Sequence, residues 1–289
     1  MKKILSHLLL TVLCAALLLA PAAAGAETQK SSNSDGSIII DYADSAKGYV
    51  SVSAKVGGSP KLAVVITTPK NTQYKYFGTD STGKTQSFVL SEGDGSYKIT
   101  VYKNVSGTKY TALHSKTITV KLTGETAPFL RANLFVDYTA DTKCVKAAAE
   151  LCGRAKNELE KVDAVYYFVI NNFAYDYDKA ATVQSGYRPV LDTVWQSKKG
   201  ICFDYASTMA AMLRSQGVAT KLVVGYAGTT YHAWINVYTE DQGWIEAVIY
   251  FDGEDWKLMD PTFASTGKSS SKIMEFIGNT ENYTAKFVY

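Results

Sequence analysis

Three residues in the second half of the chain are of types that can cooperate in covalent catalysis, and they occur in the order Cys202, His232, Asp260. A cysteine nucleophile needs a base that takes its proton and a third group that orients this base. A histidine and an aspartate fill these roles in the triads of serine and cysteine hydrolases. The three residues therefore predict acyl transfer through a thioester on Cys202.

The local sequence predicts the elements that must position these groups. A helical pattern begins at Cys202 and stops at Gly217, and the free N–H groups of a first helical turn favour a thiolate. His232 opens one predicted strand and Asp260 closes another, which we expect to be its neighbour in the same sheet. A helix start packed against this sheet could bring the three side chains within hydrogen-bonding reach.

Each residue also has an ordinary structural explanation. Free cysteine is among the most buried residue types, a single histidine can be a satisfied core residue, and aspartate before proline commonly forms turns. The joint occurrence favours catalysis, because His232 is the only histidine in residues 115–289. Cys144 and Cys152 share one predicted helix without a nearby histidine, about 12 Å apart along its axis, too far for a disulfide, so we expect them to be structural.

The rest of the second half, residues 126–289, predicts an α+β domain. Helices are expected at residues 139–154 and after an N-cap at Asn157, with Glu160 three residues on. An antiparallel meander should follow, because strand patterns cover residues 218–226, 231–239, 243–251, 255–260 and 283–289.

Five features of this half together carry a resemblance to a known family. They are the Gly200-x-Cys202-x-x-Tyr205-Ala206 start, the helix end Leu213-Arg214-Ser215-Gln216-Gly217-Val218, the Val224-Gly225-Tyr226 strand, the His232-Ala233-Trp234 strand and the Asp260-Pro261-Thr262 turn. Over residues 141–262 this ordered set resembles the transglutaminase-like superfamily. The resemblance implies a papain-like fold and a transglutaminase, peptidase or amidase activity. It also implies a Cys202 nucleophile, a His232 base and an Asp260 that orients the base.

The sequence departs from the family in one respect, and it leaves the supporting groups open. The connection from His232 to Asp260 is longer than in compact bacterial members, and an added hairpin at residues 252–253 would explain the difference. Asp260 stays the favoured third residue, with three alternatives, Glu246, Asp252 and Asp255.

The groups that stabilise an oxyanion are also open. The backbone N–H of Cys202 is one candidate donor. Gln196 has the spacing at which papain-like enzymes place a donor, but it could equally cover the core. Three aromatic residues are expected to line or support the cleft, Tyr226, Tyr231 and Trp234.

The first half of the chain has the period of two that strands require. The pattern is clearest at residues 37–42, 49–53, 61–67, 97–102 and 116–121. Short strands without a helical pattern predict an immunoglobulin-like β-sandwich over residues 27–125. The pattern changes over residues 122–128, so we expect the domain boundary there, with an exposed connection at Pro128.

Residues 1–26 have the layout of a secretory signal peptide. Two lysines precede an apolar run at residues 8–20, and small residues follow up to Ala26, where cleavage is expected. An uncleaved anchor is the alternative, because residues 4–20 approach the length that spans a bilayer. We therefore expect a secreted or cell-surface protein that meets the membrane only during export.

Composition limits the remaining functions. With 30 basic and 27 acidic residues the chain is close to neutral and has no electrostatic reason to bind nucleic acid. Outside residues 1–26 it has two histidines and no C-x-x-C pair, so neither a metal nor another cofactor is expected.

Two functions follow from these observations. The first is an exported cysteine-dependent enzyme acting on amide bonds of proteins or peptides. It would be a peptidase or amidase if water accepts the acyl group, and a transglutaminase if an amine does; we favour hydrolysis, because water is always abundant. The second is a non-catalytic cell-surface scaffold whose sandwich domain binds a polymer or a protein. A complete Cys-His-Asp set argues against the second.

Overall fold

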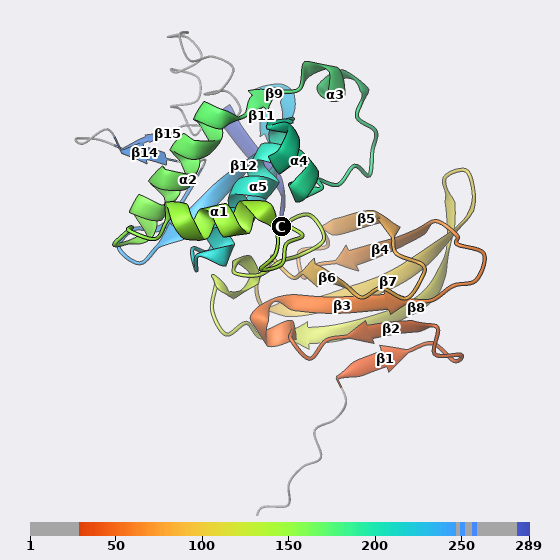
Figure 1. Cartoon of the computed structure of the whole chain (residues 1–289). Coiled ribbons are helices and arrows are strands. Elements are labelled where there is room, and N and C mark those ends of the chain that lie inside the picture. Colours follow the sequence, from red (N-terminus) through yellow and green to blue (C-terminus); the bar gives the residue numbers. More distant parts are fainter. Residues whose placement is uncertain (1–28, 247–248, 252–255, 259–281) are drawn as a thin grey trace, which may run out of the picture.

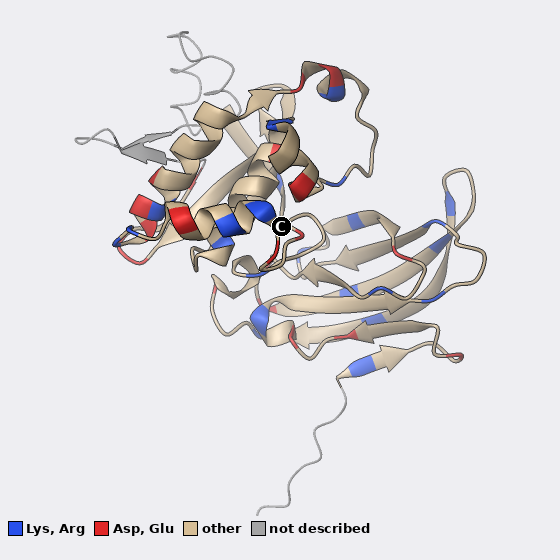
Figure 2. Ribbon diagram, in the orientation of Figure 1, with Lys and Arg blue, Asp and Glu red and all other residues tan. Residues whose placement is uncertain are grey.

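The computed structural model describes residues 29–246, 249–251, 256–258 and 282–289. An N-terminal group of strands is followed by a second group of helices and strands (Figure 1). Basic and acidic residues are interspersed along both groups, in keeping with the near-neutral composition (Figure 2). Within the described ranges, every helix is too short or too polar to cross a bilayer.

The N-terminal half consists of two four-stranded antiparallel sheets, with strand orders β1-β2-β3-β6 and β5-β4-β7-β8. The strands are β1 (Lys30–Ser32), β2 (Ile38–Asp41), β3 (Tyr49–Ala54), β4 (Leu62–Thr67), β5 (Gln73–Thr79), β6 (Gln86–Val89), β7 (Gly95–Ser106) and β8 (Lys109–Val120). A short 3-10 turn, Ser45–Lys47, precedes β3.

Side-chain alternation explains why these segments form sheets. In β2, Ile38 and Ile40 are fully buried whereas Ile39 between them is 38% exposed. Val64 of the other sheet is buried in the same core. One face of each sheet therefore covers the other, which is the layered all-β arrangement expected of this half. The narrower prediction of an immunoglobulin-like sandwich with a boundary at residues 125 and 126 stays a prediction.

The second half combines helices with an antiparallel sheet, so the α+β class is confirmed. The helices are α1 (Lys143–Leu151), α2 (Glu158–Asn172), α3 (Tyr177–Thr182), α4 (Leu191–Ser197) and α5 (Cys202–Ser215). The strands are β9 (Ala174–Tyr175), β10 (Lys199–Gly200), β11 (Thr220–Ala227), β12 (Thr230–Thr239), β13 (Gly243–Ile245), β14 (Ile249–Phe251), β15 (Trp256–Leu258) and β16 (Tyr283–Val288).

The cap of α2 is the one that the sequence predicts. Asn157 caps α2, because its side-chain oxygen accepts the Glu160 N–H at 2.9 Å. This confirms the predicted cap. At the same helix end, Glu160 Oε2 accepts the Lys156 N–H at 2.8 Å.

The sheet that carries the site has the strand order β13-β12-β11-β16, and α5 packs against β11 and β12. Met209 and Leu213 of α5 are fully buried in one core with Ile235 of β12. The start of α5 is thereby held over the sheet.

One topological prediction is wrong. Residues 243–251 contain two short strands rather than one, and β15 pairs with β14 in a separate two-stranded sheet. The neighbours of β12 are β11 and β13. The strand that precedes Asp260 is therefore not a neighbour of the strand that carries His232, because the chain turns into this extra hairpin.

The prediction of an exposed connection between the halves is also wrong. A 3-10 turn, Ala127–Phe129, follows the last N-terminal strand, and both Pro128 and Phe129 are buried. The Tyr49 hydroxyl donates to the Pro128 carbonyl at 2.6 Å. A Cβ at Gly48, whose φ is +83°, would lie 2.5 Å from Pro128 Cγ, so only glycine fits there. The turn is thus packed against the N-terminal sheets.

An aromatic cluster joins the two halves. Tyr74 and Tyr76 of β5 lie edge-on to Tyr289, with ring centroids 5.4 and 5.9 Å away. Phe135 stacks on Tyr76 and contacts Phe203 of α5, at 5.4 Å in each case. These rings place the N-terminal strand β5 beside the start of the helix that carries Cys202.

A buried arginine adds polar links beside this junction, within residues 126–289. Arg214, at the end of α5, donates to the Tyr289 carbonyl at 2.7 Å and to the Arg131 carbonyl at 2.8 Å. Burial lowers its pKa. The two halves therefore share one continuous core rather than meeting at a loose linker.

Candidate active site

Cys202 is the first residue of α5, as the sequence predicts. Ile201 before it is extended, with φ −95° and ψ 176°. Two residues on, Asp204 Oδ2 accepts the Ile201 N–H at 2.9 Å and so satisfies one free donor of the helix start. The thiol is partly exposed and faces a cavity.

Gly200 is required by this arrangement. A Cβ at this position would lie 2.6 Å from the Cβ of Asp204 and 3.1 Å from its Oδ2. Only glycine therefore leaves room for the Asp204 side chain to fold back over the helix start. This contact explains the glycine two residues before the cysteine.

Asp204 is a fully buried carboxylate with a matched set of partners. Lys179 of α3 donates to Oδ2 at 2.6 Å, and the Tyr187 hydroxyl donates to Oδ1 at 2.5 Å. Burial and the hydrogen bond to Asp204 raise the pKa of Tyr187. A buried charge needs such pairing, so this network fastens α3 and the segment after it to the start of α5. Sequence reasoning did not identify it.

His232 lies near the start of β12, where the sequence places it, and it is buried. Its cross-strand partner is Gly225 of β11. A Cβ at Gly225 would lie 2.0 Å from the Thr284 carbonyl oxygen, because β16 pairs with β11 there and the register of the pair shifts. The Trp234 ring is nearly parallel to the imidazole, with centroids 6.4 Å apart. The pairing of these strands therefore fixes the backbone position of His232.

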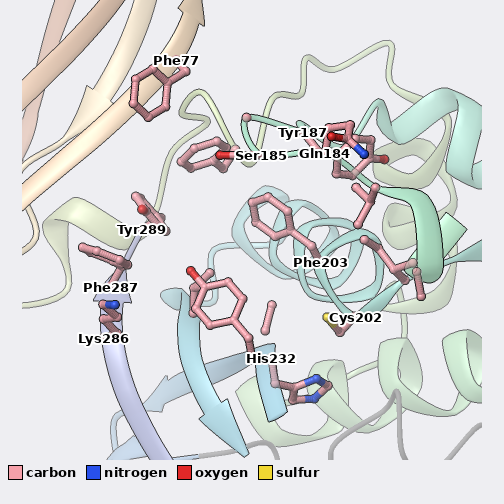
Figure 3. A pocket seen from close by; sticks show the side chains of 18 of the residues that line it. Phe77, Gln184, Ser185, Tyr187, Cys202, Phe203, His232, Lys286, Phe287 and Tyr289 are labelled. Carbon is pink, nitrogen blue, oxygen red and sulfur yellow. The ribbon is translucent and has the colours of Figure 1, made fainter. Parts of the chain in front are cut away.

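Cys202 and His232 line the same cavity, whose volume is about 690 Å³. Figure 3 shows both among the lining residues, with Phe203 and Tyr187 on the helix side and Phe77, Lys286, Phe287 and Tyr289 on the opposite side. The cavity is therefore lined by residues from both halves of the molecule. The structure brings together two of the three residues that the sequence predicts.

The carboxylate of the predicted triad is not described. Asp260 lies outside the described residues, as do the alternatives Asp252 and Asp255. Glu246 is exposed and is not among the residues that line the cavity. Asp260 therefore stays a prediction.

Of the other groups that the sequence predicts for the site, the structure places one tyrosine in the cavity lining, a second beside it and Gln196 elsewhere. Tyr231 lines the cavity, and Tyr226 packs against it with centroids 5.5 Å apart. Burial raises the pKa of Tyr231, with smaller contributions from Tyr226 and Cys202. Gln196 is exposed on α4 and does not line the cavity, so the structure does not bring it to Cys202.

The remaining thiols have no catalytic geometry among the described residues. Cys144 and Cys152 are unpaired and buried. Burial raises the pKa of Cys144 to about 12 and also raises that of Cys152. Both belong to the packing of the helical layer.

Comparison with known proteins places the site in a family. Residues 145–248 match the family described as the transglutaminase-like superfamily. The uncharacterized protein YebA of Bacillus subtilis is 28% identical over 108 residues, which are 31% of this chain and 15% of that protein. The protein-glutamine gamma-glutamyltransferase of Pseudomonas aeruginosa is 31% identical over 87 residues, 25% of this chain and 13% of that protein.

Among solved structures, a provisionally assigned cysteine protease of Cytophaga hutchinsonii superposes with a TM-score of 0.37 and 17% identity. The superposition covers 73% of this chain and 68% of that one. The chain spans less than a fifth of the length of the two sequence relatives. The family match ends before Asp260 but includes Cys202 and His232. Residues 145–248, which include Cys202 and His232, therefore match a transglutaminase-like core domain.

Proposed function

We propose that the protein is a cysteine-dependent acyl-transfer enzyme that acts on amide bonds of proteins or peptides. One observation carries the proposal: Cys202 at the start of α5 and His232 on β12 line a single cavity. A nucleophile at a helix start and a histidine base in one cleft are the minimum that such chemistry needs. The superfamily assignment of residues 145–248 supports the same activity.

The proposed reaction has two steps. His232 takes the proton of the Cys202 thiol while Sγ attacks the amide carbonyl carbon, and backbone N–H groups at the start of α5 stabilise the oxyanion. Collapse of the resulting tetrahedral intermediate breaks the C–N bond, and the leaving amine takes the proton from His232. A water or an amine then attacks the thioester carbonyl and loses its proton to His232, and His232 returns this proton to Cys202 as the C–S bond breaks. In this proposal Asp260 orients the imidazole.

The acceptor decides between peptidase or amidase and transglutaminase. We propose hydrolysis as the main reaction, because water is more concentrated than any competing amine. Amine transfer is the second possibility, and the name of the Pseudomonas aeruginosa relative favours it.

Product analysis tests the proposal and its acceptor together. The full chain is incubated with a mixed peptide pool in ¹⁸O-labelled water, with and without a biotinylated alkylamine, and products are identified by mass spectrometry. We expect products with one ¹⁸O atom from the wild type. Peptides carrying the alkylamine would assign transfer instead. No product from the wild type, or the same products from Cys202→Ala, would contradict the enzyme and leave the scaffold function.

We also propose that the protein is exported and that residues 1–26 are removed. The apolar run and the small residues before position 27 support this. Sequencing the N-terminus of the protein after expression in a secreting host should give Glu27. An N-terminus at Met1 in a membrane fraction would contradict cleavage.

A further inference from the structure

The N-terminal half supplies one wall of the cavity through β5, the edge strand of its sheet. Three alternate residues of β5, Gln73, Lys75 and Phe77, line the cavity. Tyr74 and Tyr76 point the other way and are buried. This is the alternation of an edge strand that presents one face to a ligand and the other to the core.

This wall is fixed relative to Cys202. The Val288 N–H donates to the Tyr74 hydroxyl at 3.2 Å, which ties β16 to β5. Arg188, in the segment after α3, donates to the Gly78 carbonyl at 3.0 Å. The same segment is fastened to α5 through Tyr187 and Asp204. The N-terminal strand is therefore part of the site rather than a neighbour of it.

The side of the cavity that β5 and β16 form carries charges of one sign. Lys75 of β5 and Lys286 of β16 line the cavity, and no aspartate or glutamate is among the described residues that do so. Within the described part of the chain, neither lysine forms an ion pair. Lys179 differs, because Asp204 neutralises it. The Tyr74 contact with Val288 brings the two strands together, so the two lysines lie on adjoining strands of the cavity lining.

The sheet gives the separation between this side of the cavity and the catalytic residues. His232 pairs with Gly225, and Gly225 pairs with Ala285, the residue before Lys286. Two strand spacings separate the backbones of His232 and Ala285 by roughly 10 Å. An extended peptide rises roughly 3.3 Å per residue, so about three residues bridge this distance. Lys286 lies at the end of the cavity away from Cys202 (Figure 3).

We propose that Lys75 and Lys286 bind a carboxylate of the acyl-donor peptide, about three residues from the amide that Cys202 attacks. Phe77 and Phe287 line the same wall, so the residues next to the carboxylate meet an apolar surface. This proposal rests on the proposed function, because it assigns the substrate class of that site. It makes the N-terminal half a specificity element of the enzyme.

The test uses peptide reagents that do not require a known substrate. Peptidyl vinyl sulfones carry Glu, Gln or Lys at the second, third or fourth residue from the electrophile, and the second-order rate of Cys202 labelling is measured by mass spectrometry. Iodoacetamide, which is small and neutral, measures the thiol by itself. The variants are Lys75→Glu, Lys286→Glu and the double variant. Lys109→Glu, at an exposed position of β8 that does not line the cavity, is matched in charge.

We expect the Glu reagent to react faster than its Gln counterpart, by roughly two- to fivefold for each lysine, since exposed charge pairs are individually weak. The preference should reverse to Lys in the double variant, persist in Lys109→Glu and shrink at high salt. Equal rates for Glu and Gln, or an equal loss in Lys109→Glu, would overturn the proposal. Failure of the proposed function looks different, because Cys202 would then react with no reagent faster than the other thiols do.

Discussion

Cys202 and Cys144 both lie in the first turn of a helix, yet their surroundings differ. Cys144 is fully buried in α1, and burial raises its pKa to about 12. Cys202 lines a cavity together with His232. The contrast shows that a helix start does not by itself make a nucleophile, because access and a nearby base must accompany it.

The largest expected effect separates these two thiols by function. Cys202→Ala removes the attacking atom, so we expect kcat/KM to fall by roughly 10³-fold or more. Cys144→Ala should keep kcat/KM within about twofold and lower the free energy of unfolding by about 1 kcal/mol, because it removes only a buried sulfur. Steady-state kinetics and urea unfolding measure both. Loss of activity in Cys144→Ala with intact folding would break the distinction.

The second effect compares how the two helices begin. At α5, Asp204 is fully buried and binds Lys179, Tyr187 and the Ile201 N–H. Removing this buried carboxylate leaves all three donors without their acceptor, so Asp204→Ala should lower the free energy of unfolding by about 3 kcal/mol.

The start of α1 provides the matched control. There the Lys143 N–H donates to Asp192 at 2.9 Å, and the aspartate is only half-buried. Asp192→Ala should cost about 1 kcal/mol, the usual value for a lost helix cap. Urea unfolding at pH 7 measures both variants. Equal losses would show that the Asp204 network is no more than a cap.

The smallest effect concerns alkaline pH. Because the pKa of Cys144 is about 12 in the folded protein and near 9 otherwise, the folded state keeps a proton that the unfolded state loses. The stabilisation is complete below about pH 9 and is lost as the pH rises from 9 towards 12, by at most roughly 1.4 kcal/mol per unit. Tyr97, with a pKa of about 12, acts in the same direction.

Urea unfolding at pH 8, 9 and 10 measures this slope. The free energy of unfolding of Cys144→Ala should decline less steeply than that of the wild type above pH 9. Identical slopes for the wild type and Cys144→Ala would show that the buried thiol does not contribute.

Several elements that position the site could be predicted from the sequence, because each depends on interactions between residues close together in the chain. The Asn157 cap, the helix start at Cys202 and the strand carrying His232 each depend on a few neighbouring residues. The predictions that are wrong depend on distant packing. Pro128 is typical of a linker, but Tyr49 and Gly48 bury it from eighty residues away.

The cavity wall was missed for the same reason. Lys75 and Lys286 are far apart in the chain, and contacts of Tyr74 with Phe287, Val288 and Tyr289 bring their strands together. Asp204 was visible in the sequence two residues after Cys202. Its partner Lys179 lies in a short helix without a clear sequence pattern, so the ion pair could not be predicted.

The most direct test of the central claim is the rate at which each thiol reacts with iodoacetamide at pH 7, followed by peptide mapping. We predict that Cys202 in the folded wild type reacts at least tenfold faster than Cys144 and Cys152, and that His232→Ala removes most of this difference. A Cys202 that reacts no faster than the buried thiols, or that reacts equally fast without His232, would contradict a catalytic pair in this cavity.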